Sequence, residues 1–356
     1  MPAGPAFAPL SPLDVADAHD AWNVVLQQRS HFLTFIDQPL VLISQIQRSG
    51  GTLLSQLLDG HSQLHVHPSE LRIGPTKRQW PQLDLTPPLD PDALFEALQE
   101  TMVRKHARRG YEKLGDAYKR QGGDVSGFTL PFVFLFTLQA ELFRRLIGQG
   151  TARTQRDVLD AYVTAYFNAW LDYRGLYRPA GQVKYWAAFA ARLLATPGAL
   201  EAYLADYPDG RVITPVRHPV SWYASARLHA AQYEDPAEAA ELWVQCNRTI
   251  LEGVRRRPDL IMLVQLEDLV TDTEASMRAV VRFLGVDFEP VLLRPTFNGM
   301  DVASDSSFGP RYGIDPSSRD RASEVEPHAR DLIEEKTGAL YAQIRQVALG
   351  HAQRYG

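Results

Sequence analysis

Two groups of residues, far apart in the chain, have the types and spacing of an anion-binding site. The first is the run Arg48-Ser49-Gly50-Gly51-Thr52-Leu53, in which an arginine and a serine precede two glycines. Glycines let the backbone approach an anion, and the first N–H groups of a following helix lack partners and carry partial positive charge. The second group pairs Arg217 with Ser225, eight residues later. Arginine can grip phosphate with two hydrogen bonds, so both groups predict a site for a phosphate-like ligand.

The elements around these groups place both of them at the ends of strands. An apolar run at 39–43 precedes the first group, and a helical segment at 53–58 follows it. The second group follows a buried strand at 211–216, in which Pro215 is unusual, and Pro219 suits the first turn of the helix that carries Ser225. A further apolar run at 183–186 resumes the sheet. Strands that alternate with helices predict an α/β fold with a central parallel sheet flanked by helices, and ligands of such sheets bind at the carboxyl ends of the strands.

Residues from about 86 to 178 are predicted to form a large helical insertion. Apolar residues recur at three- and four-residue spacing in the segments 92–110, 130–147 and 154–173, and each segment is followed by a break that contains glycine. Residues 61–68 read as a turn, followed by a short segment at 69–74. We expect one domain over residues 1–356, with residues 1–20 forming a loosely ordered arm because the chain starts with a Pro- and Ala-rich stretch.

Composition excludes several classes of protein. The net charge of −5 gives no electrostatic reason to expect a nucleic-acid partner. The single cysteine, Cys246, excludes an intramolecular disulfide and fits a reducing compartment. No run reaches the length of a membrane span, so we expect a cytoplasmic protein.

The two anion-binding groups resemble motifs of the sulfotransferases that use 3'-phosphoadenosine 5'-phosphosulfate (PAPS). The run at 47–52 is similar to their P-[KR]-S-G-T-T-like loop, with Gln47 in place of proline and Gly51 in place of the first threonine. Arg217 and Ser225 match the family residues that hold the 3'-phosphate, and the E-D-L at 267–269 with the F-L-G at 283–285 matches a structural segment. The resemblance implies a P-loop NTPase-like sulfotransferase fold. It also implies sulfuryl transfer from PAPS to a hydroxyl acceptor, with release of PAP and without a metal.

The resemblance also suggests a catalytic base. Glu70, followed by x-R-I, lies near the position of the base in tyrosylprotein sulfotransferases, although it could instead simply pair with Arg72. His61, His65 and His67 are alternative bases, since a histidine serves in the cytosolic members. Their H-x-x-x-H-x-H spacing could suggest a metal, but no carboxylate or cysteine pattern completes such a site, and turn histidines are more often solvated.

Further residues are implied to stabilise charge on the donor. Arg48 is the first choice, and Lys184 is the second because it matches a K-x-P-like position, with Trp186 in place of the proline. A lysine that extends to solvent from a strand end is the alternative interpretation of Lys184. The loop at 301–313 resembles the family's C-terminal lid, in which we expect Ser306, Ser307 and Arg311 to contact PAPS.

The acceptor and the class of protein stay open in part. The acceptor could be a small molecule, a glycan, a lipid or a tyrosine, and Tyr166, Trp170 and Tyr173 are the first candidates for its binding wall. The glutamate base favours the Golgi-type branch, whereas the cytoplasmic setting suggests a bacterial relative; a homodimer also stays open. Two alternatives are a P-loop kinase, disfavoured because Gly51 stands where G-x-x-x-x-G-K-[ST] has its lysine, and a non-catalytic nucleotide-binding module.

Overall fold

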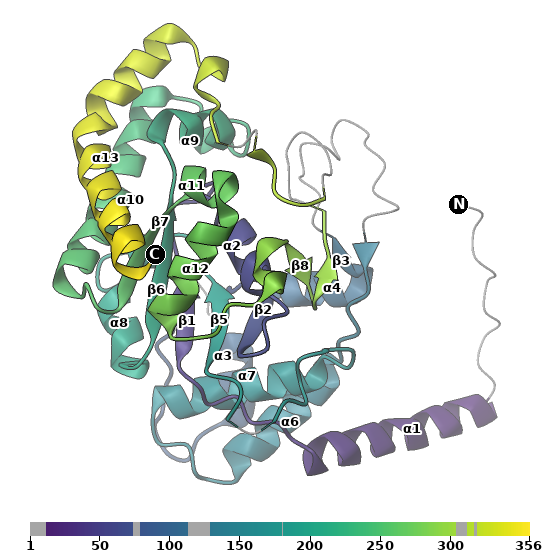
Figure 1. The fold of residues 1–356 in the computed structure, drawn as a ribbon. Helices are drawn as coiled ribbons and strands as arrows, with labels where there is room; N and C mark the ends of the chain where they lie inside the picture. Colours follow the sequence, from purple (N-terminus) through teal and green to yellow (C-terminus); the bar gives the residue numbers. More distant parts are fainter. Residues whose placement is uncertain (1–11, 74–78, 113–128, 180, 304–311, 317–318) are drawn as a thin grey trace, which may run out of the picture.

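A parallel five-stranded sheet lies at the centre of the computed structural model, which describes residues 12–73, 79–112, 129–179, 181–303, 312–316 and 319–356 (Figure 1). The strand order is β2-β5-β1-β6-β7, so the first strand of the chain is central. All four neighbouring pairs are parallel. The strands are β1 (Leu40–Ile43), β2 (Leu64–Glu70), β5 (Tyr185–Phe189), β6 (Arg211–Val216) and β7 (Ile261–Gln265). The predicted fold class, a parallel sheet flanked by helices, is confirmed.

Helices cover both faces of the sheet, and the side-chain alternation of β1 explains why. Leu40 and Leu42 belong to one buried cluster, whereas Val41 and Ile43 belong to another, as the two-residue period of a strand requires. The first cluster includes residues of α7 to α10, and the second includes residues of α2, α11 and α12. The helices outside the insertion are α1 (Pro12–His31), α2 (Gly51–Leu58), α8 (Ala199–Asp206), α9 (Pro219–Ala226), α10 (Pro236–Arg256), α11 (Leu266–Thr271), α12 (Thr273–Leu284) and α13 (Pro327–Tyr355).

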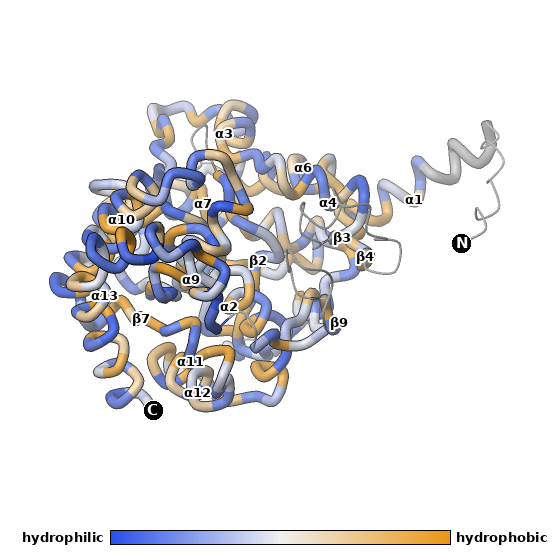
Figure 2. The backbone as a smooth tube through the Cα atoms, turned by 90° about the horizontal axis from the view of Figure 1, so that it is seen from above, coloured by the Kyte–Doolittle hydropathy of each residue, from blue (hydrophilic) through white to orange (hydrophobic). Residues whose placement is uncertain are grey.

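The hydropathy of the chain follows this layering. Figure 2 shows β7 as a hydrophobic stretch beside α10 and α13, which alternate between hydrophilic and hydrophobic residues. Short elements link the larger helices and strands. They are the 3-10 turns η1 (Leu193–Ala195), η2 (Ala231–Tyr233), η3 (Pro290–Leu293) and η5 (Ala322–Glu324) and the antiparallel pair β8 (Thr296–Phe297) and β9 (Met300–Asp301).

Pro215 sits in an inner strand without breaking the sheet. Val212 donates its N–H to Leu260 of the β7 side, so position 215, an odd number of residues away, faces β1 instead. The pairing of β1 with β6 ends at Ile43 and Ile213, so no ladder partner is lost at Pro215.

The segment at 86–178 is mostly helical, but its helices are shorter than the periodicity predicted. It contains α3 (Pro91–Leu98), α4 (Thr101–Arg109), α6 (Phe136–Gly148), α7 (Gln155–Ala169) and the antiparallel pair β3 (Tyr111–Glu112) and β4 (Thr129–Leu130). The prediction of one helix over 92–110 is wrong because Gln99 and Glu100 are extended. The Glu100 carboxylate accepts a hydrogen bond from the backbone N–H of Arg72, which holds the break against β2.

Two other local predictions were wrong. Residues 61–68, expected to form a turn, contain most of edge strand β2, and residues 12–20, expected within a loose arm, belong to α1. α1 extends away from the rest of the molecule in both views (Figures 1 and 2). Its last turn is fixed by Arg29, which donates to the Tyr177 hydroxyl at 2.7 Å and to the Leu171 carbonyl at 3.1 Å.

Candidate active site

The glycine-rich run forms a tight turn between β1 and α2, as predicted. Arg48 and Gly50 both have positive φ angles, 69° and 96°. The first backbone hydrogen bond of α2 joins Leu54 N–H to the Gly50 carbonyl at 3.0 Å. The N–H groups of residues 51–53 therefore fall outside the hydrogen-bond ladder of the helix, and they are oriented for an anion at its N-terminus.

Neighbouring side chains explain why glycine occupies position 51, where the family loop has threonine. A Cβ atom on Gly51 would collide with the Gln45 side chain and the Phe189 ring. Gln45, just after β1, and Phe189, at the end of β5, therefore fill the space that a side chain at position 51 would need. Next to it, Ser49 is 1% exposed, and its hydroxyl has no hydrogen-bond partner within the parts of the chain that the structure describes.

The fold brings the second group onto the first. Arg217, directly after β6, donates from Nη1 to the Arg48 carbonyl at 3.2 Å. Arg48 in turn donates from Nε to the Ser225 hydroxyl on α9 at 3.2 Å. Arg217 is 4% exposed and Ser225 is 3% exposed, so both belong to the floor of the site rather than to its rim. Residues 169 and 177 positions apart in sequence thus form one hydrogen-bonded cluster.

A third arginine, Arg321, joins this cluster, although no motif in the sequence predicted it. Its backbone N–H donates to the Ser221 hydroxyl at 3.1 Å, one helical turn before Ser225 on α9. Burial lowers the pKa of Arg217 to about 10; Glu267 opposes this shift, and the positive charges of Arg321 and Arg48 add to it. The Arg321 side chain pairs with Glu324 at 2.9 Å, and Glu324 also opposes the shift at Arg217. Three arginines and two carboxylates leave an excess of positive charge that a bound anion would relieve. The only available signal was an arginine shortly after the loop at 301–313.

Glu70 is the last residue of β2, at the carboxyl ends of the strands, where the glycine-rich turn also lies. It pairs across the β2–β5 register with Phe189, the residue whose ring lies against the Gly51 position. Its carboxylate forms an ion pair with Arg72, with Nε to Oε2 at 2.9 Å. The side chain of Glu70 is 19% exposed, so solvent and ligands reach it. Glu70 therefore lies at the carboxyl ends of the strands, where a base was expected, and it also forms the alternative ion pair with Arg72.

The three histidines are buried rather than solvated, contrary to expectation. His61 is 0% exposed and lies before β2, at the opposite edge of the sheet from Glu70, where its Nε2 donates to the Asp287 carbonyl at 2.8 Å. His65 is 2% exposed and contacts the Tyr173 hydroxyl at 3.1 Å; burial lowers its pKa to about 3, with a smaller contribution from Arg178. His67 is 1% exposed and forms an ion pair with Glu100.

The structure contradicts the assignment of Lys184. β5 begins only at Tyr185, so Lys184 lies at the amino ends of the parallel strands, whereas the glycine-rich turn lies at their carboxyl ends. Its backbone N–H donates to the Gln63 carbonyl, and its exposed ammonium group donates to the Gly285 carbonyl at 2.7 Å. The error came from a strand boundary that was placed two residues too early.

Arg192 is the cation that follows β5, and it was not among the residues predicted for the site. It has a left-handed backbone with φ of 62°, is 4% exposed, and donates to the Tyr233 hydroxyl. Its backbone N–H donates to the Gln45 carbonyl at 2.8 Å, and Tyr233 donates to the Gln47 side chain at 3.2 Å. No carboxylate within the described part of the chain forms an ion pair with Arg192. A buried arginine directly after the apolar run 186–191 was the available signal.

The remaining predicted residues do not complete an open pocket. Tyr166, Trp170 and Tyr173 are 1%, 0% and 9% exposed, and Trp170 stacks on Tyr173 with ring centroids 4.6 Å apart, so these three are core rather than an acceptor wall. Ser306, Ser307 and Arg311 lie outside the described residues. Among the residues that are described, no group of three or more His, Cys, Asp or Glu could hold a metal ion. Within the same ranges, no helix is long and apolar enough to cross a membrane.

Comparison with known proteins identifies the family of this chain. The model of the sulfotransferase family matches residues 39–290, so the chain belongs to that family. A search of curated proteins finds no match. Among solved structures, the sulfotransferase domain of the Synechococcus PCC 7002 olefin synthase is 24% identical, with 85% of this chain and 96% of that chain covered and a TM-score of 0.48. Sulfotransferase STF9 from Mycobacterium avium is 14% identical, with 94% and 87% covered and a TM-score of 0.40.

Proposed function

We propose that this sulfotransferase transfers a sulfuryl group from PAPS to a hydroxyl-bearing acceptor and releases PAP. The observation that carries the proposal is the convergence of Arg48, Arg217 and Arg321 with the buried Ser225 hydroxyl beside the N-terminus of α2. A donor with phosphate groups at both its 3' and 5' positions matches a site with two kinds of anion contact. One is the helix N-terminus with its glycines, and the other is the arginine and serine pair.

Two sets of groups would bind the two charged ends of PAPS. The N–H groups of residues 51–53, with Ser49, Thr52 and Arg48, would hold the 5'-phosphosulfate, and Arg217 and Ser225, supported by Arg321, would hold the 3'-phosphate. No divalent metal is required in this arrangement, because arginines and backbone N–H groups meet the donor's charge. A kinase is disfavoured for the same reason, and because position 51 has neither a lysine nor room for one.

Glu70 is the proposed base. The acceptor oxygen forms a bond to sulfur as the bond from sulfur to the 5'-phosphate oxygen breaks, and the acceptor proton passes to the Glu70 carboxylate. The negative charge that develops on the leaving phosphate is stabilised by Arg48 and the helix N-terminus. Glu70 suits this role because it ends the strand next to β5, whose Phe189 contacts the glycine-rich turn.

Calorimetry separates the donor proposal from its alternatives. With EDTA present, PAP should bind at least about tenfold more tightly than ADP, since a hydrogen bond to a charged group is worth about 1.5–3 kcal/mol. A kinase would instead prefer ATP and need Mg²⁺. Equal binding of PAP and ADP would refute PAPS as the donor.

Turnover of Glu70→Gln tests the base. The rate should fall by about 10²–10⁴ while PAP affinity stays near that of the wild type. Glu141→Gln makes the same change at a surface ion pair with Arg145 and serves as the matched control. Full activity of Glu70→Gln would assign the base elsewhere, and a protein that binds PAP without any turnover would be a nucleotide-binding module.

A further inference from the structure

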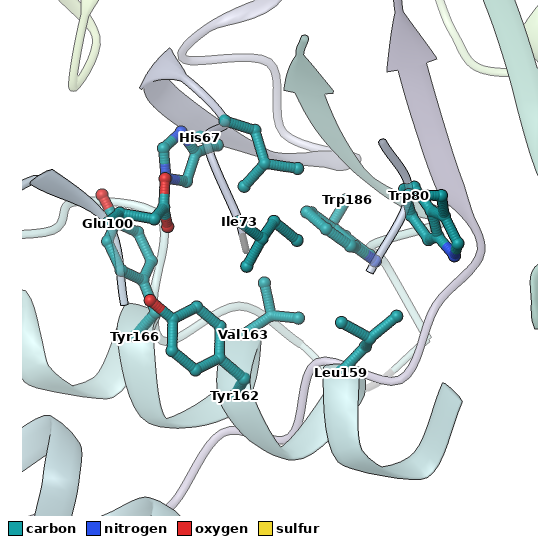
Figure 3. A pocket seen from close by; sticks show the side chains of 10 residues that line it. His67, Ile73, Trp80, Glu100, Leu159, Tyr162, Val163, Tyr166 and Trp186 are labelled. Atoms are coloured by element: carbon teal, nitrogen blue, oxygen red, sulfur yellow. The ribbon is translucent and has the colours of Figure 1, made fainter. Parts of the chain in front are cut away.

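A buried ion pair lies directly beneath the segment that carries Glu70. His67, on β2, and Glu100, just before α4, have side chains that are each 1% exposed, with Nε2 and Oε1 3.3 Å apart. Figure 3 shows the two side chains together at one end of a small cavity, with Trp80 and Trp186 at the other end. Two charges are costly to bury, so their presence calls for a specific role.

The pair holds the backbone on both sides of Glu70. His67 donates from Nδ1 to the Ser69 carbonyl at 2.8 Å, just before Glu70. Glu100 accepts the Arg72 N–H at 3.3 Å, two residues after Glu70. Between these contacts, Leu71 N–H donates to the carbonyl of Phe189 at 2.6 Å, which joins the same segment to β5. The chain direction at Glu70 is therefore set by three backbone hydrogen bonds, two of which depend on the His67–Glu100 pair.

The groups around the pair favour a protonated His67. Burial alone lowers the pKa of His67, but the Glu100 charge and the hydrogen bonds to Glu100 and the Ser69 carbonyl outweigh burial and raise it. From α7, the Tyr166 ring stacks on His67 at 4.9 Å. Tyr162 of α7 also hydrogen-bonds Glu100, and burial raises the pKa of both tyrosine hydroxyls well above 10, so both are neutral. A doubly protonated imidazole carries the positive charge that pairs with Glu100 while its Nδ1 donates to the Ser69 carbonyl.

The cavity itself is too small for an acceptor. Its volume is about 10 Å³, close to the lower limit for one water molecule. The Tyr166 hydroxyl, which faces the Glu100 end of the cavity in Figure 3, has no hydrogen-bond partner in the described segments. The pair thus acts on the backbone rather than on the acceptor.

We propose that His67 and Glu100 are positioning residues for the proposed base Glu70, holding its strand end in the geometry that proton removal from the acceptor requires. This inference rests on the proposed function of Glu70. Turnover then needs a protonated His67. As the pH rises through the folded-state pKa of His67, above its ordinary value of 6.5, the imidazolium is lost and kcat falls, whereas PAP affinity does not change.

Glu100→Gln is the main test because it keeps the shape of the side chain and an oxygen that can accept the Arg72 N–H. We expect kcat to fall by about 10- to 100-fold, the effect of a small misplacement of a reacting group, with PAP affinity within about twofold of the wild type. The alkaline limb of the kcat profile should move to lower pH, and so should the His67 imidazole titration followed by NMR. Glu100→Asp, which keeps the charge, should recover part of the rate. Glu141→Gln is the matched control at the surface.

A double variant distinguishes this proposal from the assignment of the base. If the pair acts through Glu70, Glu100→Gln should cost little further rate in a Glu70→Gln background. An equal loss in both backgrounds overturns the positioning role, whereas a fully active Glu70→Gln single variant overturns the base itself. If Glu100→Gln does not fold, the wild-type protein decides: a His67 titration that does not coincide with the alkaline limb of kcat overturns the proposal.

Discussion

Replacing Ser225 by alanine isolates a single contact of the proposed donor site. Ser225 is 3% exposed on α9, and its hydroxyl accepts from Arg48 Nε at 3.2 Å. Alanine favours the helix and removes only the hydroxyl. If that hydroxyl binds the 3'-phosphate, its loss removes one hydrogen bond to a charged group, about 1.5–3 kcal/mol. The affinity for PAP should then fall by about 10- to 150-fold.

The affinity for ADP provides the internal reference. ADP has no 3'-phosphate, so it should lose only the smaller effect of releasing Arg48 from Ser225, which PAP shares. The quantity to measure by calorimetry is therefore the ratio of the two dissociation constants at one fixed salt concentration. Arg217→Ala should abolish most of the preference, because a guanidinium contributes more than one hydrogen bond.

Thr214→Val is the matched control. It removes a hydroxyl from a residue that is 0% exposed on β6, three residues before Arg217, and keeps the branched shape of the side chain. This variant should retain the wild-type preference for PAP. A preference that survives intact in Ser225→Ala would show that the hydroxyl does not contact the 3'-phosphate and would refute the reasoning from spacing.

Three further predictions follow from the geometry. Lys184→Ala should leave kcat and PAP affinity within about twofold of the wild type in steady-state assays, since its ammonium group lies at the opposite edge of the sheet. Gly51→Ala should lower the free energy of unfolding in urea by about 1–3 kcal/mol, because the added methyl group meets Gln45 and Phe189; unchanged stability would contradict the close packing. The pKa of His65 is lowered to about 3, so the unfolded chain binds the extra proton and stability should fall as pH drops from about 6.5 towards 3; His65→Gln should reduce the slope of this loss by about one proton.

The sequence by itself determined the parts of the site that depend on short-range chemistry. Apolar runs mark β1, β6 and β7, and the glycines at 50 and 51 mark the turn before α2. Pro219 marks the start of α9. These signals act within a few residues of the chain, because glycine and proline restrict or release the backbone locally and a buried strand needs an unbroken apolar run. The order of these elements was sufficient to predict the fold class.

Tertiary structure decided what depends on partners distant in sequence. β2 is a strand because it pairs with β5; the alternation of Leu64 and Val66 with His65 and His67 is too short to mark a strand by itself. The same pairing fixes where β5 begins, and it therefore places Lys184 at one edge of the sheet and Arg192 at the other. The helix break at Glu100 depends on His67 and Arg72, which lie about 30 residues earlier in the chain.

The arginine cluster gives the physical reason for this division. Nothing near Arg321 in the sequence indicates that its charge would act on Arg217, about a hundred residues earlier. Local propensity is a sum over neighbours in the chain, whereas electrostatic interaction and burial depend only on distance in space. Sequence spacing could therefore predict each anion-binding motif, but only the packing of α9 against the C-terminal segment brings the third positive charge to the site.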